Sequence, residues 1–86
     1  MEEMLRKFKD EFKSVYNLYL EASDLVENID KYPENYDKDD KNSAWTRFKR
    51  KSGQMYELRK IAKILGYTQE QINIWENEIY DKYNNV

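Results

Sequence analysis

The sequence predicts an all-α protein, a single domain over residues 1–86 built as an antiparallel three-helix bundle. Three observations predict it. In the first third of the chain, apolar residues recur at alternating steps of four and three, the a/d pattern of a helix packed along one stripe. A second run with the same spacing follows a polar segment. A helix stop signal and a helix start signal then introduce a third, shorter amphipathic pattern.

The first helix is expected over about residues 2–28. Met4, Leu18 and Leu25 fall on the g position beside its a/d stripe, and a stripe of this width is typical of a helix that touches two partners. Pro33 and the polar residues after it predict a surface loop. The a/d stripe consists of Met1, Leu5, Phe8, Phe12, Val15, Tyr19, Ala22, Val26 and Ile29.

The second helix is expected over about residues 43–65, with Asn42 or Ser43 as its N-cap. Gly53 weakens a helix interior by about 1 kcal/mol relative to Ala. We nevertheless expect a continuous helix, because the apolar stripe keeps its phase across the glycine. That stripe consists of Ala44, Phe48, Lys51, Met55, Leu58, Ala62 and Leu65.

The third helix is expected over about residues 69–83. Gly66 follows the second helix at the position where a left-handed residue commonly ends a helix. Thr68 and Gln71 have the spacing of a capping box, and Tyr67 and Ile72 that of a hydrophobic staple. The expected packed face consists of Ile72, Trp75, Ile79 and Tyr83.

Composition excludes most catalytic chemistry. The chain has no cysteine and no histidine, which removes Ser-His and Cys-His nucleophile pairs and the usual zinc ligand sets. Its two glycines are too far apart for a phosphate-binding loop. We therefore expect no enzyme activity, no cofactor and no metal. The sequence shows neither an apolar run of about 18 residues nor a secretory signal, so we expect a cytoplasmic protein without a membrane span.

Charge is unevenly distributed along the chain. Residues 41–63 hold eight basic residues and one acidic residue, a balance of +7, whereas residues 21–40 have a balance of −6. A basic helix with interleaved aromatic residues is typical of a surface that binds a polyanion or a protein partner. Its positive charges can equally pair with the acidic segment, either within the fold or in a second copy. The candidate binding residues are Trp45, Arg47, Lys49, Arg50, Lys51, Tyr56, Arg59, Lys60 and Lys63.

The segment 58–78 combines a small residue, Ala62, with a turn glycine, Gly66, and two apolar residues, Ile72 and Trp75, in the following helix. In this spacing it resembles the helix-turn-helix of DNA-binding regulators. The resemblance implies that the third helix enters the major groove. It also implies base or phosphate contacts from Thr68, Gln69, Asn73 and Asn77.

Several large apolar residues lie outside the helix stripes, which suggests a second apolar surface. The first helix also outreaches the third by roughly 15 Å at about 1.5 Å per residue. Part of its stripe therefore lacks an intrachain partner, and we expect a homodimer or a higher oligomer. The candidate oligomer contacts are Leu18, Leu20, Ile74 and Tyr80.

These observations favour a small non-enzymatic interaction protein that binds a protein partner. Its size, and a composition rich in Lys, Asn and Ile as an AT-rich genome would produce, fit a phage or mobile-element accessory protein that inhibits a host system. A helix-turn-helix DNA-binding regulator is the first alternative. It ranks second because the expected third helix has no Lys or Arg before Lys82, whereas DNA affinity depends on phosphate neutralisation. An oligomeric binder of a small anionic ligand, such as a nucleotide, is the second alternative.

Overall fold

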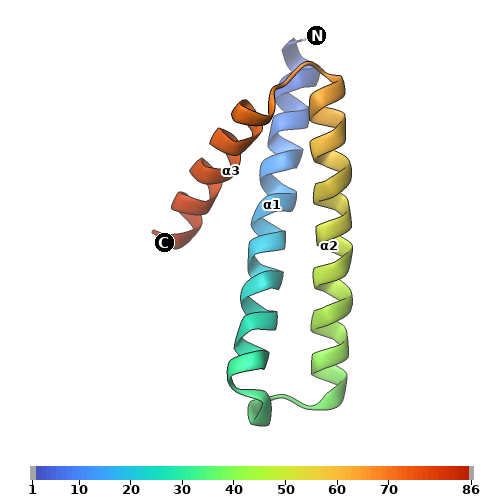
Figure 1. Cartoon of the computed structure of the whole chain (residues 1–86), viewed down its shortest axis with the longest axis vertical. Coiled ribbons are helices and arrows are strands. Elements are labelled where there is room, and N and C mark those ends of the chain that lie inside the picture. The colour runs from blue at the N-terminus through green and yellow to red at the C-terminus, as the bar shows by residue number, and fades with distance from the viewer. Residues whose placement is uncertain (1, 86) are drawn as a thin grey trace.

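The computed structural model describes residues 2–85, and the helices in it confirm the predicted all-α class with a long N-terminal helix (Figure 1). Helix α1 spans Glu2–Lys31, a 3-10 turn η1 spans Pro33–Asn35, α2 spans Lys38–Ile64 and α3 spans Gln69–Asn84. Met1, expected to begin the apolar stripe, lies outside the described residues. No helix in the described part of the chain is both long and apolar enough to cross a membrane.

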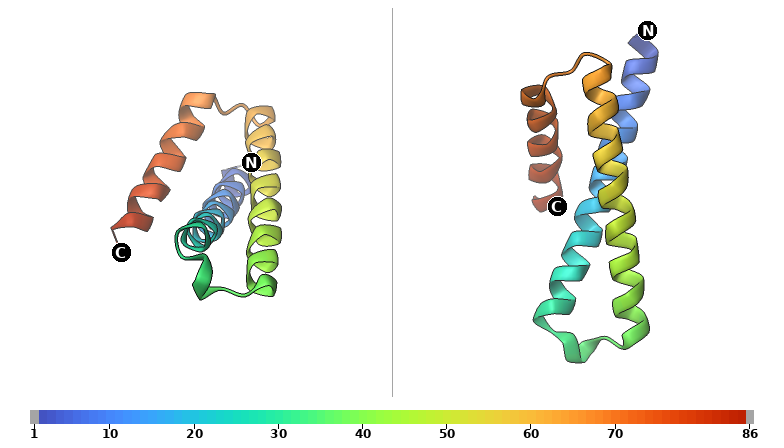
Figure 2. Two further views of the ribbon diagram at one scale, coloured as in Figure 1. Left: turned by 60° about the horizontal axis from the view of Figure 1, so that its bottom comes forward. Right: turned by 45° about the vertical axis from the view of Figure 1, so that its right-hand side comes forward.

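The first two helices form an antiparallel hairpin along the whole length of the molecule, which measures 49 × 25 × 20 Å (Figure 1). Helix α3 turns back at the end where α1 begins and runs in the same direction as α1. It covers the hairpin near that end and leaves the far end as a two-helix structure (Figure 2). One side of the hairpin thus faces α3, whereas the other has no helix upon it.

Helix α2 begins earlier than the sequence suggested, so the expected N-cap at Asn42 or Ser43 is wrong. Asp37 is the N-cap, and its side chain accepts a hydrogen bond of 2.7 Å from the backbone N–H of Asp40. The Asp40 carboxylate accepts in return from the backbone N–H of Asp37 at 3.5 Å. The aspartates that suggested a surface loop form a capping box, which also places negative charge at the positive end of the helix dipole.

The corner between α2 and α3 is built as predicted. Gly66 adopts a left-handed φ of 103°. The Tyr67 N–H bonds to the Ala62 carbonyl at 3.0 Å, and the Gly66 N–H bonds to the Lys63 carbonyl at 3.1 Å. This pair of bonds is a Schellman motif, which satisfies the last carbonyls of α2 and reverses the chain direction.

The start of α3 is fixed by the predicted capping box. The Thr68 hydroxyl accepts from the Gln71 N–H at 3.1 Å, and the Gln71 side chain accepts from the Thr68 N–H at 2.8 Å. Tyr67 packs edge-on against Trp75, with ring centroids 4.5 Å apart, and joins the same apolar cluster as Ile72. The local sequence thus sets the direction in which α3 leaves the corner.

The main core lies where all three helices meet, and Phe12, Met55 and Ile72 are fully enclosed there. Leu20 belongs to this core and is only 7% exposed. Its assignment as an oligomer contact is therefore wrong, because α3 covers the side of α1 on which Leu20 lies. Leu65, expected on the stripe of α2, is 41% exposed because it is the C-cap residue after the last helical turn.

A smaller cluster closes the far end of the hairpin. It is formed by Val26, Ile29 and Ala44, with Leu25, Tyr36 and Phe48 packed around it. Gly53 lies within the continuous helix α2, as the phase of the apolar stripe predicted. A Cβ atom added at Gly53 would meet nothing within 4 Å, so this exposed position faces open space.

Candidate functional site

The basic residues of α2 do not form a single surface. Arg50 and Arg59 are nine residues apart, which at 3.6 residues per turn places them about 180° apart around the helix. Arg59 faces α3, because it pairs with Glu76 of that helix. Arg50 lines a groove with Leu18 of α1 on the other side. The binding surface expected from the sequence is thus divided between two sides of the hairpin.

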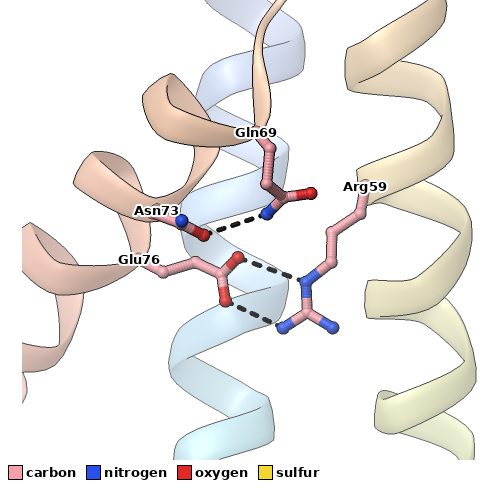
Figure 3. Close-up of polar contacts among 4 residues, drawn as sticks. All are labelled: Arg59, Gln69, Asn73 and Glu76. Atoms are coloured by element: carbon pink, nitrogen blue, oxygen red, sulfur yellow. Dashed lines mark hydrogen bonds and ion pairs between the residues drawn. The ribbon is translucent and has the colours of Figure 1, made fainter.

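Arg59 is held by a two-pronged ion pair with Glu76. Its Nε donates to Glu76 Oε2 at 3.1 Å, and its Nη2 donates to Glu76 Oε1 at 2.8 Å (Figure 3). The hydrogen bond to this carboxylate raises the pKa of Arg59 above its usual value. Arg59, expected to bind a partner, instead joins α2 to α3 within the chain. The two residues are seventeen positions apart, a separation at which the sequence carries no pairing signal.

A row of aromatic rings from α1 and α2 lies along the side of the hairpin that faces α3. Tyr16 stacks on Tyr19 at 5.9 Å, Tyr19 on Phe48 at 5.6 Å, and Phe48 meets Trp45 edge-on at 5.8 Å, all between ring centroids. Burial raises the pKa of the Tyr16 hydroxyl, and the nearby Glu76 carboxylate adds to this effect. Tyr16 and Tyr19 are functional candidates that the sequence did not indicate, and Tyr19 falls on the expected packing stripe of the first helix.

We define the aromatic–basic face as Trp45, Lys49, Tyr56, Lys60 and Lys63. These residues follow one another along α2 at steps of four, seven, four and three, so they form one stripe. Trp45 is 44% and Tyr56 61% exposed. The Lys60 ammonium lies 5.1 Å from the centroid of the Tyr56 ring, in cation–π contact. Within residues 2–85, none of the three ion pairs found involves a lysine of this face.

Helix α3 carries one more exposed aromatic residue. Tyr80 lies one turn after Glu76, on the side of α3 that faces α2, and is 49% exposed. Ile74, the other candidate oligomer contact on α3, is 50% exposed but lies on the opposite side of the helix, away from the core residue Trp75. The structure thus separates two residues that the sequence reasoning had grouped.

Three other cations lie on the far side of α2. Arg47, Arg50 and Lys51 line an open groove of about 510 Å³ together with Leu18. Lys51 donates to the Gln54 side chain at 3.1 Å. The polar residues Asn42, Ser43 and Thr46 complete the lining. Leu18 lies here because it is two positions, about 200°, away from the buried Leu20.

The residues expected to read DNA are partly engaged with one another. The Thr68 hydroxyl serves as the N-cap of α3. Gln69 donates to the Asn73 side chain at 2.9 Å, one turn from the ion pair of Glu76 (Figure 3). Asn77 is exposed. The structure brings Gln69 and Asn73 together beside Arg59, at the junction of α2 and α3.

Within residues 2–85, no group of three or more acidic side chains is arranged to hold a metal ion.

Comparison of the chain with protein-family models, curated proteins and solved structures found no match.

Proposed function

We propose that this chain is a small non-enzymatic interaction protein whose aromatic–basic face binds an acidic surface of a protein partner. The observation that carries the proposal is the exposure of Trp45 and Tyr56 among lysines that make no ion pair within residues 2–85. Tryptophan and tyrosine are enriched at the centres of protein interfaces, where they bury large areas at small entropic cost. Lysines around them would pair with carboxylates of the partner.

Two features favour a protein over duplex DNA as the partner. Helix α3 carries Glu70, Glu78 and Asp81, and its one basic residue is Lys82 in the last turn. Phosphates approaching α3 would therefore meet negative charge, whereas DNA affinity depends on phosphate neutralisation. The chain also carries a net charge of −2. A mobility-shift assay at low salt tests the DNA alternative, and we expect no shift at micromolar protein.

We further propose that the protein acts in the cytoplasm as an accessory protein of a phage or mobile element that inhibits a host system. Small size and a sequence without cysteine or histidine support this role, since an inhibitor needs only a surface that occupies its target. The partner would then be a host protein with an acidic, partly apolar docking site.

The test is capture from a nuclease-treated host lysate, read by mass spectrometry. We compare the wild type with Trp45→Ala/Tyr56→Ala and with Lys49→Glu/Lys60→Glu. Ile74→Ala is the matched control, because Ile74 is similarly exposed but lies on α3 away from this face. Loss of an interface anchor typically weakens binding by about 2 kcal/mol or more, roughly 30-fold.

We expect the wild type and Ile74→Ala to capture the same protein, and both face variants to lose it while keeping the helical circular dichroism signal. Equal capture by all four proteins would place the partner elsewhere on the molecule. Capture that occurs in a parallel untreated lysate and disappears after nuclease treatment would favour the DNA-binding alternative.

A further inference from the structure

The side of the hairpin that α3 leaves uncovered is hollowed along its length. Three adjoining hollows of about 300, 510 and 340 Å³ line it between α1 and α2. Leu25, Leu18 and Glu11 of α1 each line one of them, in that order. These residues are seven positions apart and so lie on one stripe of the helix. We call this surface the α1–α2 groove.

Charge along the α1–α2 groove changes sign between its second and third hollows. Arg47, Arg50 and Lys51 line the second hollow, and Arg47 also lines the first, together with Asp40. Glu11 and Glu57 line the third, together with Gly53 and the apolar side chains of Val15 and Leu58. Gly53 thus lies between the basic and the acidic part, and no atom fills the space where its side chain would be.

A surface whose two halves are complementary can pair with a copy of itself through a two-fold axis. We propose that the α1–α2 groove is the interface of a homodimer in which two chains pack antiparallel, with the axis passing beside Gly53 and Gln54. Arg50 and Glu57 are equally distant from this point along α2. The rotation therefore places Arg50 of each chain opposite Glu57 of the second copy, twice in the dimer.

The same rotation gives a consistent pairing on α1. Glu11 comes opposite Leu18 of the second copy, and Met4 comes opposite Leu25 of the second copy. Met4 is 67% exposed in the single chain. Exposing an apolar side chain to water is unfavourable, and this pairing would bury it. Because Gly53 has no side chain, the two α2 helices can approach closely at the axis.

The dimer also explains why a chain of this size leaves so much apolar surface beside the groove. Ile61 and Leu65 are each 41% exposed on the same side of α2. A small domain buries a low fraction of its surface on its own, and a second copy extends its core into a four-helix arrangement. The aromatic–basic face lies on the other side of α2 and stays accessible in both chains.

The first test is the mass in solution together with a reciprocal charge reversal. We expect the wild type to sediment at about twice 10.6 kDa at tens of micromolar. Arg50→Glu and Glu57→Arg each create two like-charged contacts across the axis, and we expect each to raise the dimer Kd about 100-fold. An equimolar mixture of the two variants restores both opposite-charge contacts, so it should form a 1:1 heterodimer. Lys49→Glu, the same charge change outside the groove, should leave the mass unchanged.

The second test needs no charge change. The chain has no cysteine, so Gln54→Cys introduces one thiol next to the proposed axis, and we expect a disulfide-linked dimer on mild oxidation. Asn77→Cys, an exposed thiol on α3, should remain monomeric on the same gel.

A monomeric wild type overturns the proposal, as does a mixture of charge variants that fails to associate, or a Gln54→Cys protein that does not cross-link. Circular dichroism confirms that each variant is folded. Trp45→Ala/Tyr56→Ala should lose the protein partner while keeping the dimer mass. Failure of the proposed function is therefore distinguishable from failure of the dimer.

Discussion

The two ends of the hairpin are held together differently. Near the N-terminus, three helices share a core in which Phe12, Met55 and Ile72 are fully enclosed. At the far end α1 and α2 meet over three buried residues, Val26, Ile29 and Ala44, with partly buried neighbours. Since buried apolar area is the main source of stability, most of the free energy of unfolding should reside where α3 covers the hairpin. Both candidate surfaces lie along α2, which spans the two ends.

The largest expected effect is a core truncation at the three-helix end. Phe12→Ala removes a ring that contacts Trp75 edge-on at 5.5 Å, and we expect a loss of about 3–5 kcal/mol in unfolding free energy. Ile29→Ala at the two-helix end should cost about 2 kcal/mol, the lower limit for such a change, because its neighbours can collapse into the space. Urea denaturation measures both. Equal losses would mean that the two ends contribute equally.

The next effect is that of the ion pair which holds α3 against α2. Glu76→Gln leaves the Arg59 guanidinium partly buried without its carboxylate, and we expect a loss of about 1–2 kcal/mol, limited by the 37% exposure of the Arg59 side chain. A double-mutant cycle with Arg59→Met isolates the coupling between the two residues. A coupling near zero would show that apolar packing alone positions α3.

The fold could be predicted from the sequence largely because its signals are local. The apolar stripes, Gly66 and the Thr68 capping box each act within a few residues; Gly66 and the capping box are found where the spacing placed them, and the middle of each stripe is buried. The start of α2 was missed because Asp37 and Asp40 have the composition of a loop, although the same two residues serve as a capping box. Leu20 was misplaced because its burial depends on α3, which lies far away in the sequence.

For the candidate site, the sequence indicated which residues are basic and aromatic, but not how they are arranged in space. The sequence identified the basic and aromatic residues of α2, but it could not show on which side α3 would lie. Arg59 and Arg50 therefore appeared equivalent, although one is paired within the chain and the other lines the open groove. Helical periodicity places residues around a helix, whereas the position of a third helix depends on packing between distant segments.

Removing a helix cap at either end of the hairpin should lower the free energy of unfolding by a smaller amount, and should show how the two ends differ. Thr68→Ala and Asp37→Ala each remove the side chain that accepts from an N3 backbone N–H, and each should cost about 1 kcal/mol. The first should destabilise the whole core, because α3 depends on its cap to enter the three-helix packing. The second should fray only the first turns of α2. Hydrogen exchange distinguishes the two, since Asp37→Ala should accelerate amides near residue 40 and leave those of α3 protected.

The smallest effect concerns the contact that ties the end of α3 to α1. The Tyr83 hydroxyl donates to the Asp24 carboxylate, and this hydrogen bond is the main cause that raises the pKa of Tyr83 from 10.0 to about 12. The folded chain thus holds this proton more tightly than the unfolded chain. The contribution of the bond is complete below pH 10 and is lost as the pH rises through about 12.

Tyr83→Phe should therefore lower stability slightly at neutral pH and have no effect above pH 12. The quantity to measure is the difference in unfolding free energy between the two proteins at each pH. Tyrosinate absorbance provides a direct measurement: the absorbance change near pH 12 should be smaller in Tyr83→Phe than in the wild type. An equal change near pH 12 in the two proteins would show that Tyr83 does not hold its proton through Asp24, and that this hydrogen bond does not tie the end of α3 to α1.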